Sequence, residues 1–587
     1  MQTKEYVVIL KKGINLDQVW TDIESVTSGL PHIPDRPVSI VDNFDAFDRQ
    51  CVYSLTDNEA EQLRNDSRVA GVEIPIEQMP GIEIKGTTVQ NPATYSPPGN
   101  FTKPTTDLST GTSINWGLIR NSNPTNVYGT GTATTSNYIY GPDGTGVDVV
   151  ISDSGIQADH PEFQYTGNSA SRVQQINWAT YVPALSTMGN SYQDANGHGT
   201  HVAGTAAGKT YGWAKGSQVY SILAYGAGAP TIANQFSAIK LWHQSKGATG
   251  RPTVVNMSWG ASYSWWYLGG LSSTTPDIYS NWQLAMVNFL STITSVIYRG
   301  TTYTSGTATT FGLLLDTTNP DCVRSFREGF PGWSMQTEDQ LQTLIDAGII
   351  VVAAAGNNSY KIDKSVGGTG DYNNRVYSRL LANGGNDYYQ RGTSPHVANS
   401  INVGALDSTT YSATQDQKAT YSCAGPGVDV YSAGTKILSA TTSNVSATAY
   451  AQSAPYFLNT SFRQLNYGGT SMASPQIAGI AALYLQAHPL ANNFSSNNCL
   501  QIKSWITSGA TSTMYSPGAA DSYTNFRSTV GGNSTVAYQS IQGLTQIKSS
   551  NNNWQSPINI SVKTAADTWT TVNKVWTKTA TGWQQVY

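Results

Sequence analysis

The chain has 587 residues, a formal net charge of −4 and only 12% charged residues. One hydrophobic core stops growing at about 250 to 300 residues, so two or three domains are expected. The slight acidic excess excludes the broad cationic surface on which most nucleic-acid-binding proteins depend. The polar but weakly ionic composition, with 55 glycines, 33 tyrosines and 15 tryptophans, is typical of extracellular, capsid or tail proteins.

Residues 1–79 are predicted to form a small α+β domain. Strands are expected at residues 6–10, 38–41, 51–55 and 68–74. Apolar residues recur at helical spacing from Leu16 to Val26, and Thr56 with Glu59 three residues later is a capping box that begins a second helix. The order β, α, β, β, α, β is that of a ferredoxin-like fold.

Residues 80–113 are rich in Pro, Gly, Thr and Asn, lack hydrophobic periodicity and are predicted to be a linker. Residues 114–548 instead contain continuous apolar runs of the kind buried on both faces of a parallel sheet. These runs are residues 147–153, 218–224, 253–260 and 349–357. An α/β, doubly wound and mostly parallel sheet is therefore expected, interrupted at residues 261–336 by an inserted subdomain rich in Trp, Tyr, Ser and Thr.

Residues 549–587 are predicted to form a small β-rich extension. Trp569 with Val572 recurs fourteen positions later as Trp583 with Val586, which indicates a short repeat. The alternative is an ordinary hairpin with two exposed tryptophans.

The sequence begins without the pattern of a signal peptide and has no apolar run of about 18 residues. We therefore expect no cleaved secretion signal and no membrane insertion. The four cysteines are far apart and form no CxxC pair, which argues against a zinc or redox motif and leaves one or two disulfides open. They are Cys51, Cys322, Cys423 and Cys499.

Several polar residues have the chemistry that a serine nucleophile requires, namely a base, a carboxylate that orients the base, and donors to the oxyanion. They are Asp153 in DSGI, His198 in HGTHVAG, Asn357 in AAAGN and Ser471 in GTSMASP. Glycines beside all four permit close approach of the backbone to a substrate. The helix expected after Ser471 directs N–H groups and its positive dipole end toward developing negative charge.

The segments DSGI, HGTHVAG, NMSWG, AAAGN and GTSMASP, in this order, resemble the subtilisin-like serine peptidases, or subtilases. Residues 201–218 resemble the proteinase K-like branch, since they pass from helix to strand without a calcium-loop insertion. The resemblance covers about residues 115–515, and residues 1–79 resemble the inhibitory propeptide of the family, whose last strand lies in the active-site cleft. It does not account for residues 261–336, much of 358–395, or the C-terminal extension.

The resemblance implies a role for each catalytic candidate. Ser471 would attack the scissile carbonyl, His198 would act as base and then acid, and Asp153 would orient the imidazole. Asn357 and the N–H of Ser471 would form the oxyanion hole. The order Asp, His, Ser along the chain is that of subtilisin itself.

Substrate-binding residues are also implied by the resemblance. The pocket for the residue before the cleaved bond would be lined by Ser258, Trp259, Gly260, Ala353, Ala354 and Gly356. The segment 225–229, with Gly226, Ala227 and Gly228 at its centre, would pair with extended substrate as an added strand.

The reaction implied needs no cofactor, but a structural calcium ion is a candidate ligand. Asp429 in GVDVYSAG matches a family position that ligates a weakly held cation. The alternative is a surface aspartate that binds only water. His201, three residues after His198, lacks the glutamate of an HExxH site and is expected to be a core histidine.

We therefore expect a serine endopeptidase that is made as a self-inhibited precursor, acts on protein or peptide substrates and cuts itself between about Ile74 and Ser113. The alternative is a catalytically latent structural or binding protein of a phage particle. All four catalytic candidates are present, which favours activity. A lipase or esterase is disfavoured because Ser471 lies in GTSMA and not in a GxSxG elbow.

The exterior-type composition without a secretion signal favours a location on the tail or surface of a phage virion. Phage structural proteins would then be partners of the C-terminal extension, with Trp569, Trp576 and Trp583 as aromatic anchors. The alternative is a bacterial enzyme released by lysis or by another route.

Overall fold

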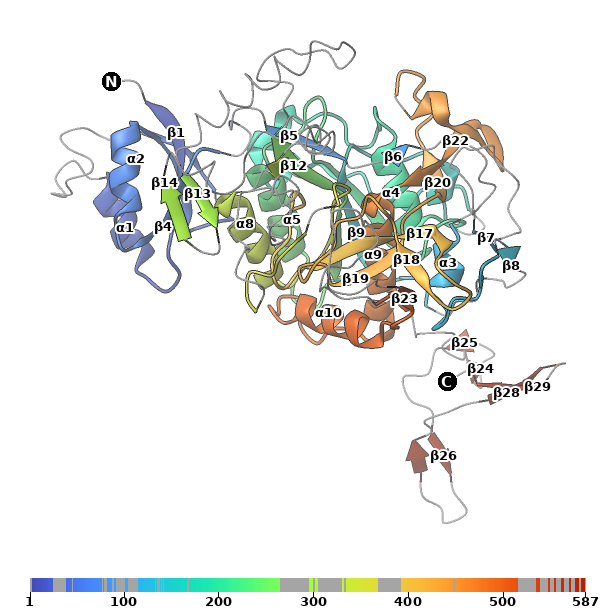
Figure 1. Cartoon of the computed structure of the whole chain (residues 1–587). Coiled ribbons are helices and arrows are strands. Elements are labelled where there is room, and N and C mark those ends of the chain that lie inside the picture. Colours follow the sequence, from blue (N-terminus) through green and yellow to red (C-terminus); the bar gives the residue numbers. More distant parts are fainter. Residues whose placement is uncertain are drawn as a thin grey trace, which may run out of the picture.

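A computed structural model defines the fold of the chain (Figure 1). The residues that it describes are 3–24, 39–44, 46–75, 78, 82–86, 89–90, 101–103, 115–131, 133–134, 138, 140, 142–165, 168–263, 334–359, 361–367, 392–447, 449–515, 535–538 and short strands between 295 and 331 and after 547.

The N-terminal unit has the predicted order of elements. It consists of β1 (Lys4–Leu10), α1 (Leu16–Glu24), β2 (Ser39–Asn43), β3 (Gln50–Leu55), α2 (Asp57–Arg64) and β4 (Val69–Glu73). The strands form one antiparallel sheet in the order β2-β3-β1-β4. The capping box of Thr56 and Glu59 begins α2, as expected. Because side chains alternate along β1, Tyr6, Val8 and Leu10 pack under the two helices of this unit.

The opposite face of this sheet packs against the rest of the protein. Val7 and Ile9 belong to the same apolar cluster as the main core. The surface they meet includes α5 (Ile232–Ser245) and α8 (Met335–Asp346), where Lys240 Nζ donates to the carbonyl of Ala46 at 2.6 Å. Arg49 forms an ion pair with Asp339 of α8. Burial and charge therefore hold the N-terminal unit on these helices.

The main sheet has eight strands, most of them parallel. They are β9 (Asp148–Asp153), β10 (Gln218–Leu223), β11 (Thr253–Met257), β16 (Ile350–Ala354), β17 (Ile401–Thr410), β18 (Asp416–Lys418), β19 (Val430–Ala433) and β23 (Met514–Tyr515). β10, β9, β11, β16 and β17 are neighbours in that order and run parallel. The doubly wound, mostly parallel sheet predicted from the apolar runs is confirmed.

The order of these strands positions the site. β10 lies on one side of β9 and β11 on the other, so the winding reverses at β9, and ligands of such sheets bind beyond the carboxyl ends of the strands at this point. Two helices, α4 (His198–Ala207) and α9 (Thr470–Ala487), pack against each other and against this part of the sheet. A further helix, α10 (Asn498–Gly509), contacts β16. Among the described helices, none combines the length and apolar composition that a bilayer crossing requires.

Residues 80–113 differ from the structureless linker that the sequence predicts. They contain β5 (Ile82–Gly86), β6 (Val89–Gln90) and β7 (Phe101–Thr102). β5 pairs with β12 (Trp259–Tyr263), β6 with β22 (Asn459–Gly468), and β7 with β8 (Ala133–Thr134). Such pairing uses backbone groups of an available strand edge, so it requires no hydrophobic periodicity that a sequence could reveal.

Lys103 lies within this region and is completely buried. Its Nζ lies 3.2 Å from Asp416 Oδ1, and Arg120 Nη2 lies 2.7 Å from Asp416 Oδ2. These buried contacts attach Lys103 to the main unit.

The remaining elements lie at the edges of the main unit or after it. β22 pairs with β20 (Ile437–Thr441) and β21 (Ala454–Tyr456), while β12 also pairs with β15 (Phe330–Pro331). The other described part of the expected insertion at 261–336 is chiefly the hairpin of β13 (Ser295–Tyr298) and β14 (Thr301–Thr304). Most of this insertion lies outside the described residues.

Toward the C-terminus the structure has three short antiparallel pairs. They are β24 (Ile547–Lys548) with β25 (Trp554–Gln555), β26 (Ser561–Lys563) with β27 (Trp569–Thr571), and β28 (Trp576–Thr579) with β29 (Gly582–Gln585). Val572 and Val586 lie outside the described residues, so the repeat remains a prediction.

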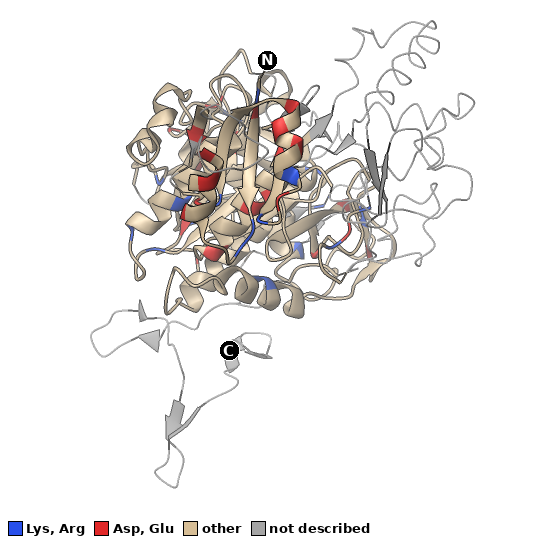
Figure 2. Cartoon of the chain, turned by 90° about the vertical axis from the view of Figure 1, so that its left-hand side faces the viewer, with Lys and Arg blue, Asp and Glu red and all other residues tan. Residues whose placement is uncertain are grey.

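In the described part of the chain, Figure 2 shows basic and acidic residues interspersed along the ribbon. Cys51, Cys423 and Cys499 are buried thiols that form no disulfide with one another. Cys322 lies outside the described residues.

Candidate active site

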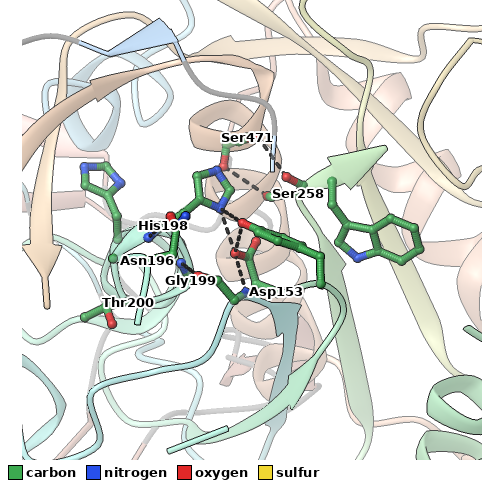
Figure 3. A network of polar contacts seen from close by, with 12 residues as sticks. Asp153, Asn196, His198, Gly199, Thr200, Ser258 and Ser471 are labelled. Atoms are coloured by element: carbon green, nitrogen blue, oxygen red, sulfur yellow. Dashed lines mark hydrogen bonds and ion pairs between the residues drawn. The ribbon is translucent and has the colours of Figure 1, made fainter. Parts of the chain in front are cut away.

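Asp153 is the last residue of β9, at the carboxyl end of this strand, and is fully buried. Its Oδ1 accepts a hydrogen bond from the N–H of Ser154 at 2.7 Å and lies 2.7 Å from His198 Nδ1 (Figure 3). A carboxylate on Nδ1 leaves Nε2 of the imidazole as the atom that can accept a proton. The structure therefore brings together Asp153 and His198, as predicted.

His198 is the first residue of α4, and a buried aspartate fixes the turn that precedes it. Asp194 accepts hydrogen bonds from the N–H groups of Asn196, Gly197 and Thr200 and from the hydroxyls of Thr200 and Ser154. These bonds satisfy N–H groups that a helix start leaves without intrahelical partners. His198 is thus held at a rigid helix terminus.

Gly199 allows α4 to approach the end of β9. A Cβ at this position would lie 2.1 Å from the carbonyl oxygen of Gly155, closer than atoms can come. A side chain here would push His198 away from Asp153. The glycine of the HGTH segment is therefore required by packing as well as by any role toward a substrate.

Ser471 is the second residue of α9, which begins after Gly469. Its Oγ donates to the carbonyl of Ser258 at 3.0 Å, and Ser258 Oγ donates to the carbonyl of Ser471 at 3.0 Å. Figure 3 shows the Ser471 side chain next to the His198 ring. His198 Nε2 is buried and has no hydrogen-bond partner in the described part of the chain, so the Ser471 hydroxyl would turn from Ser258 toward Nε2 to react.

The amide of Asn357 is oriented by Thr470. Asn357 Oδ1 accepts from both the N–H and the hydroxyl of Thr470 at 2.8 Å. The hydroxyl of Thr470 also accepts from the N–H of Gly356 at 3.0 Å. Because the amide oxygen is occupied by two donors, its NH₂ group is directed to the other side, where it can serve as a donor. This orientation fits the predicted oxyanion role.

The predicted pocket residues lie along β12 and β16. Ser258 contacts the nucleophile directly, whereas the ring of Trp259 is buried and donates to Ser152 Oγ at 3.0 Å. Trp259 therefore faces the core, and its backbone is the part that lies along β5. A Cβ at Gly260 would lie 2.8 Å from the carbonyl oxygen of Thr393. Two further members on β16, Ala353 and Ala354, are fully buried. Gly356 lies in the segment that follows this strand.

Residues 226–228 form an exposed turn rather than a strand. Gly226 and Gly228 have φ values of +97° and +75°, which favour glycine, and the N–H of Ala229 donates to the carbonyl of Gly226 at 3.1 Å. The carbonyl of Gly228 accepts from Gly189 at 2.9 Å. Pairing of this segment with an extended substrate remains a prediction.

Asp429 is paired with a cation of the chain itself. Lys503 Nζ lies 2.8 Å from Asp429 Oδ1, and it donates to the carbonyls of Ala398 and Ser400, each at 2.8 Å. Asp429 Oδ2 accepts from the N–H of Asn402 at 2.9 Å. A metal ion bound by these oxygens would have to displace the ammonium group, so the residues around Asp429 do not fit a calcium ion while Lys503 is in place.

His201 is a core histidine, as expected. Its Nε2 lies 2.9 Å from the carbonyl oxygen of Ile437 and 3.0 Å from that of Leu465. Burial, together with the nearby His198, lowers the pKa of His201 to about 3. Among the described residues, no group of three or more His, Cys, Asp or Glu side chains could hold a metal ion.

Sequence reasoning missed the side-chain contacts of four residues that shape the site. These are Asp194, Tyr225, Thr470 and Lys503. For Asp194 a signal existed, since an aspartate shortly before a helix favours capping. Thr470 is adjacent to Ser471, but its partner Asn357 is 113 positions away. No local pattern identifies Tyr225 or Lys503, whose partners come from other parts of the chain.

Comparisons with known proteins identify the family of the chain. Residues 144–531 match the profile of the subtilase family. The chain is 27% identical over 443 residues to an extracellular serine proteinase of Thermus sp. (strain Rt41A), covering 76% of this chain and 68% of that protein. It is 28% identical over 298 residues to alkaline protease 1 of Emericella nidulans, covering 48% of this chain and 61% of that protein.

A solved structure of a cold-adapted subtilisin-like serine proteinase is also similar. The TM-score is 0.40 at 20% identity, and the match covers 73% of this chain and 98% of that chain. The family profile covers well over half of the chain, including Asp153, His198, Asn357 and Ser471. The chain therefore belongs to the subtilase family of subtilisin-like serine peptidases.

Proposed function

We propose that Asp153, His198 and Ser471 are the catalytic triad of this serine endopeptidase and that peptide bonds are hydrolysed through an acyl-enzyme. The observation that carries the proposal is the buried 2.7 Å contact between Asp153 Oδ1 and His198 Nδ1 beside the N-terminus of α9, where Ser471 lies. Protein or peptide would be the substrate.

In the first step, the Ser471 hydroxyl gives its proton to His198 Nε2 as Oγ attacks the scissile carbonyl carbon. Negative charge then develops on the carbonyl oxygen, where Asn357 Nδ2 and the N–H of Ser471 donate to it. His198 returns the proton to the leaving amine. Water, deprotonated by the same imidazole, then releases the acyl group and restores Ser471.

The first substrate would be the chain itself. β5 places Gly86 opposite Trp259, the neighbour of Ser258, and β6 places Val89 opposite Gly468, three residues before Ser471. Only two residues separate Gly86 from Val89, so we propose that the bond to be cut lies between these two anchor points. Thr87–Thr88, the middle bond of this interval, is the proposed cleavage site.

A cut at this bond would not release the N-terminal unit by itself. The unit would keep its apolar contact with α5 and α8 and the ion pair of Arg49 with Asp339. β5 would remain along β12 and block the cleft. We therefore propose a self-inhibited precursor, which becomes active when residues 1–87 dissociate or are degraded.

Intact-mass analysis of purified wild type, Ser471→Ala and the exposed control Ser461→Ala tests both proposals. We expect wild type and Ser461→Ala to yield two fragments with a new N-terminus at Thr88, and to react with a serine-directed fluorophosphonate once the N-terminal fragment is removed. Ser471→Ala should stay intact and unlabelled. An uncut wild type with full activity would contradict the self-processing, and cleavage of a protein substrate by Ser471→Ala would remove Ser471 from the mechanism.

A location on a phage particle is a further proposal, supported by the exterior-type composition and by the β-strand pairs of residues 547–585. Deletion of residues 549–587 should abolish association with particles while hydrolysis of a soluble protein persists. Particles that retain the truncated chain, or lack the full chain, would contradict it. A latent structural protein would instead show particle association without fluorophosphonate labelling.

A further inference from the structure

A tyrosine hydroxyl contacts the Asp153–His198 pair. Tyr225 follows β10, and its hydroxyl donates to Asp153 Oδ1 at 2.9 Å and lies 3.0 Å from His198 Nδ1. The backbone holds this residue in place, because the N–H of the preceding Ala224 donates to the main-chain carbonyl of Asp153 at 2.8 Å. The contact therefore follows from the parallel pairing of β10 with β9.

The hydroxyl is the donor in this contact. Burial, together with the charge of Asp153 and that of Asp194 behind it, raises the pKa of Tyr225 well above its usual value of 10.0. The hydroxyl is thus protonated throughout the pH range in which a peptidase acts. His198 Nδ1 must carry a proton for Nε2 to act as base, so Nδ1 cannot accept from Tyr225 in the reactive tautomer. The proton of the hydroxyl is left to Asp153.

Asp153 Oδ1 then receives three donors, while Oδ2 has no hydrogen-bond partner in the described part of the chain. An sp² oxygen has two lone pairs, so three donors compete for its charge. The hydrogen bond from Tyr225 reduces the negative charge of Asp153 Oδ1 that is available to the imidazole. The hydroxyl therefore weakens the stabilisation that Asp153 gives to a protonated His198.

We infer that Tyr225 is a positioning residue that sets the pH at which His198 becomes a base. It holds part of the Asp153 charge and so favours the neutral imidazole in the resting enzyme. The inference rests on the proposed triad and adds a fourth side chain to it. No bond from the Tyr225 side chain to a substrate atom is assigned.

Other groups near His198 bear on the same titration and remain unchanged by a substitution at Tyr225. Asp194 lies in the turn before α4, His201 lies one turn further along α4, and Tyr467 of β22 packs its ring 6.4 Å from that of His198. His201, with a pKa of about 3, is neutral at the working pH and adds no charge. Asp194 is present in the wild type and in the Tyr225 variants, so its effect on the protonation of His198 is the same in both.

The test is the pH dependence of kcat/KM for Tyr225→Phe on a soluble peptide, with mature enzyme freed of its N-terminal fragment. The matched control is Tyr220→Phe, because Tyr220 lies on β10 and its hydroxyl contacts Gln218 at 3.0 Å, away from the triad. We expect the midpoint of the acid limb of Tyr225→Phe to move upward by roughly one pH unit. A hydrogen bond to a charged group contributes at least as much free energy as a shift of one pKa unit requires. KM should change little, and Tyr220→Phe should keep the wild-type midpoint.

A second variant, for which we expect the midpoint of the pH profile to shift in the opposite direction, tests the inference if Tyr225→Phe fails to fold. Incorporation of 3-fluorotyrosine at position 225 keeps the shape and strengthens the donor, so the midpoint should move downward. An unchanged midpoint in either folded variant, or a downward shift in Tyr225→Phe, overturns the inference. A wild type that neither cleaves peptide nor reacts with fluorophosphonate would instead overturn the proposed function.

Discussion

Replacement of Asp416 by asparagine should destabilise the main unit severely, because this carboxylate is the anion of a buried ion cluster. Lys103, Arg120 and Asp416 all have side chains that are 0% exposed. Arg120 also donates to Thr513 Oγ1 at 2.7 Å, whereas the ammonium of Lys103 otherwise lies over the ring of Trp116, 4.8 Å from its centre. Of the two cations, Lys103 therefore depends more on Asp416 for its charge compensation.

The expected magnitude follows from what Asp416→Asn leaves behind. The shape of the side chain is kept, but two buried cations lose their counter-charge, and breaking a buried pair in this way costs about 3–5 kcal/mol. Folded domains have a free energy of unfolding of about 5–15 kcal/mol, so this loss is a large fraction of the total. We expect residues 101–103 to detach first, since that returns the Lys103 ammonium to water.

Urea unfolding followed by tryptophan fluorescence measures the effect, in a Ser471→Ala background so that self-digestion does not remove the unfolded chain. The variants are Asp416→Asn, Lys103→Met and both together. Since Met removes one of the two uncompensated cations, the double variant should be less destabilised than the sum of the single ones. Loss below about 0.5 kcal/mol for Asp416→Asn, or strict additivity, would refute the reasoning.

The same ion cluster predicts how the free energy of unfolding depends on pH. Burial alone would raise the pKa of Asp416, but the charges of Arg120 and Lys103 hold it below the ordinary value of 3.8. A pKa that is lower in the folded than in the unfolded state contributes stability above the unfolded value and loses it as pH falls through the folded value. The difference in unfolding free energy between the parent and Asp416→Asn should therefore shrink below about pH 4.

Three further outcomes are expected. Asn357→Ala should lower kcat by roughly 100- to 1000-fold, the magnitude established for one oxyanion donor in subtilisin, with little change in KM; a change mainly in KM would contradict the oxyanion role. In wild type, kcat/KM should rise with pH on its acid side, because only a neutral imidazole can accept the Ser471 proton, and a flat profile from about pH 5 to 9 would exclude a histidine base. Lys503→Met should lower the melting temperature and make it sensitive to added calcium, whereas the parent should respond little to EDTA; an equal EDTA effect on both would show that a metal ion, and not Lys503, neutralises Asp429.

The α/β fold class and the candidate residues Asp153, His198, Asn357 and Ser471 could be predicted from short segments of the sequence. The reason is that these features are local. A strand buried on both faces needs a continuous apolar run, and a reactive side chain at the end of a strand or the start of a helix needs small neighbours such as Gly199. Both requirements appear as short sequence segments in a fixed order.

The groups that surround the candidate triad could not be predicted from the sequence and became visible only in the folded chain. Tyr225 meets Asp153 across 72 positions, and Lys503 meets Asp429 across 74, because separate strands and helices bring them together. The ring of Trp259 faces the core because Ser152 of the neighbouring β9 accepts from it. β5 and β6 pair through backbone groups, which are the same in every residue but proline. The partners in such contacts are far apart in the sequence and become neighbours only when the chain folds, so no local sequence pattern predicts them.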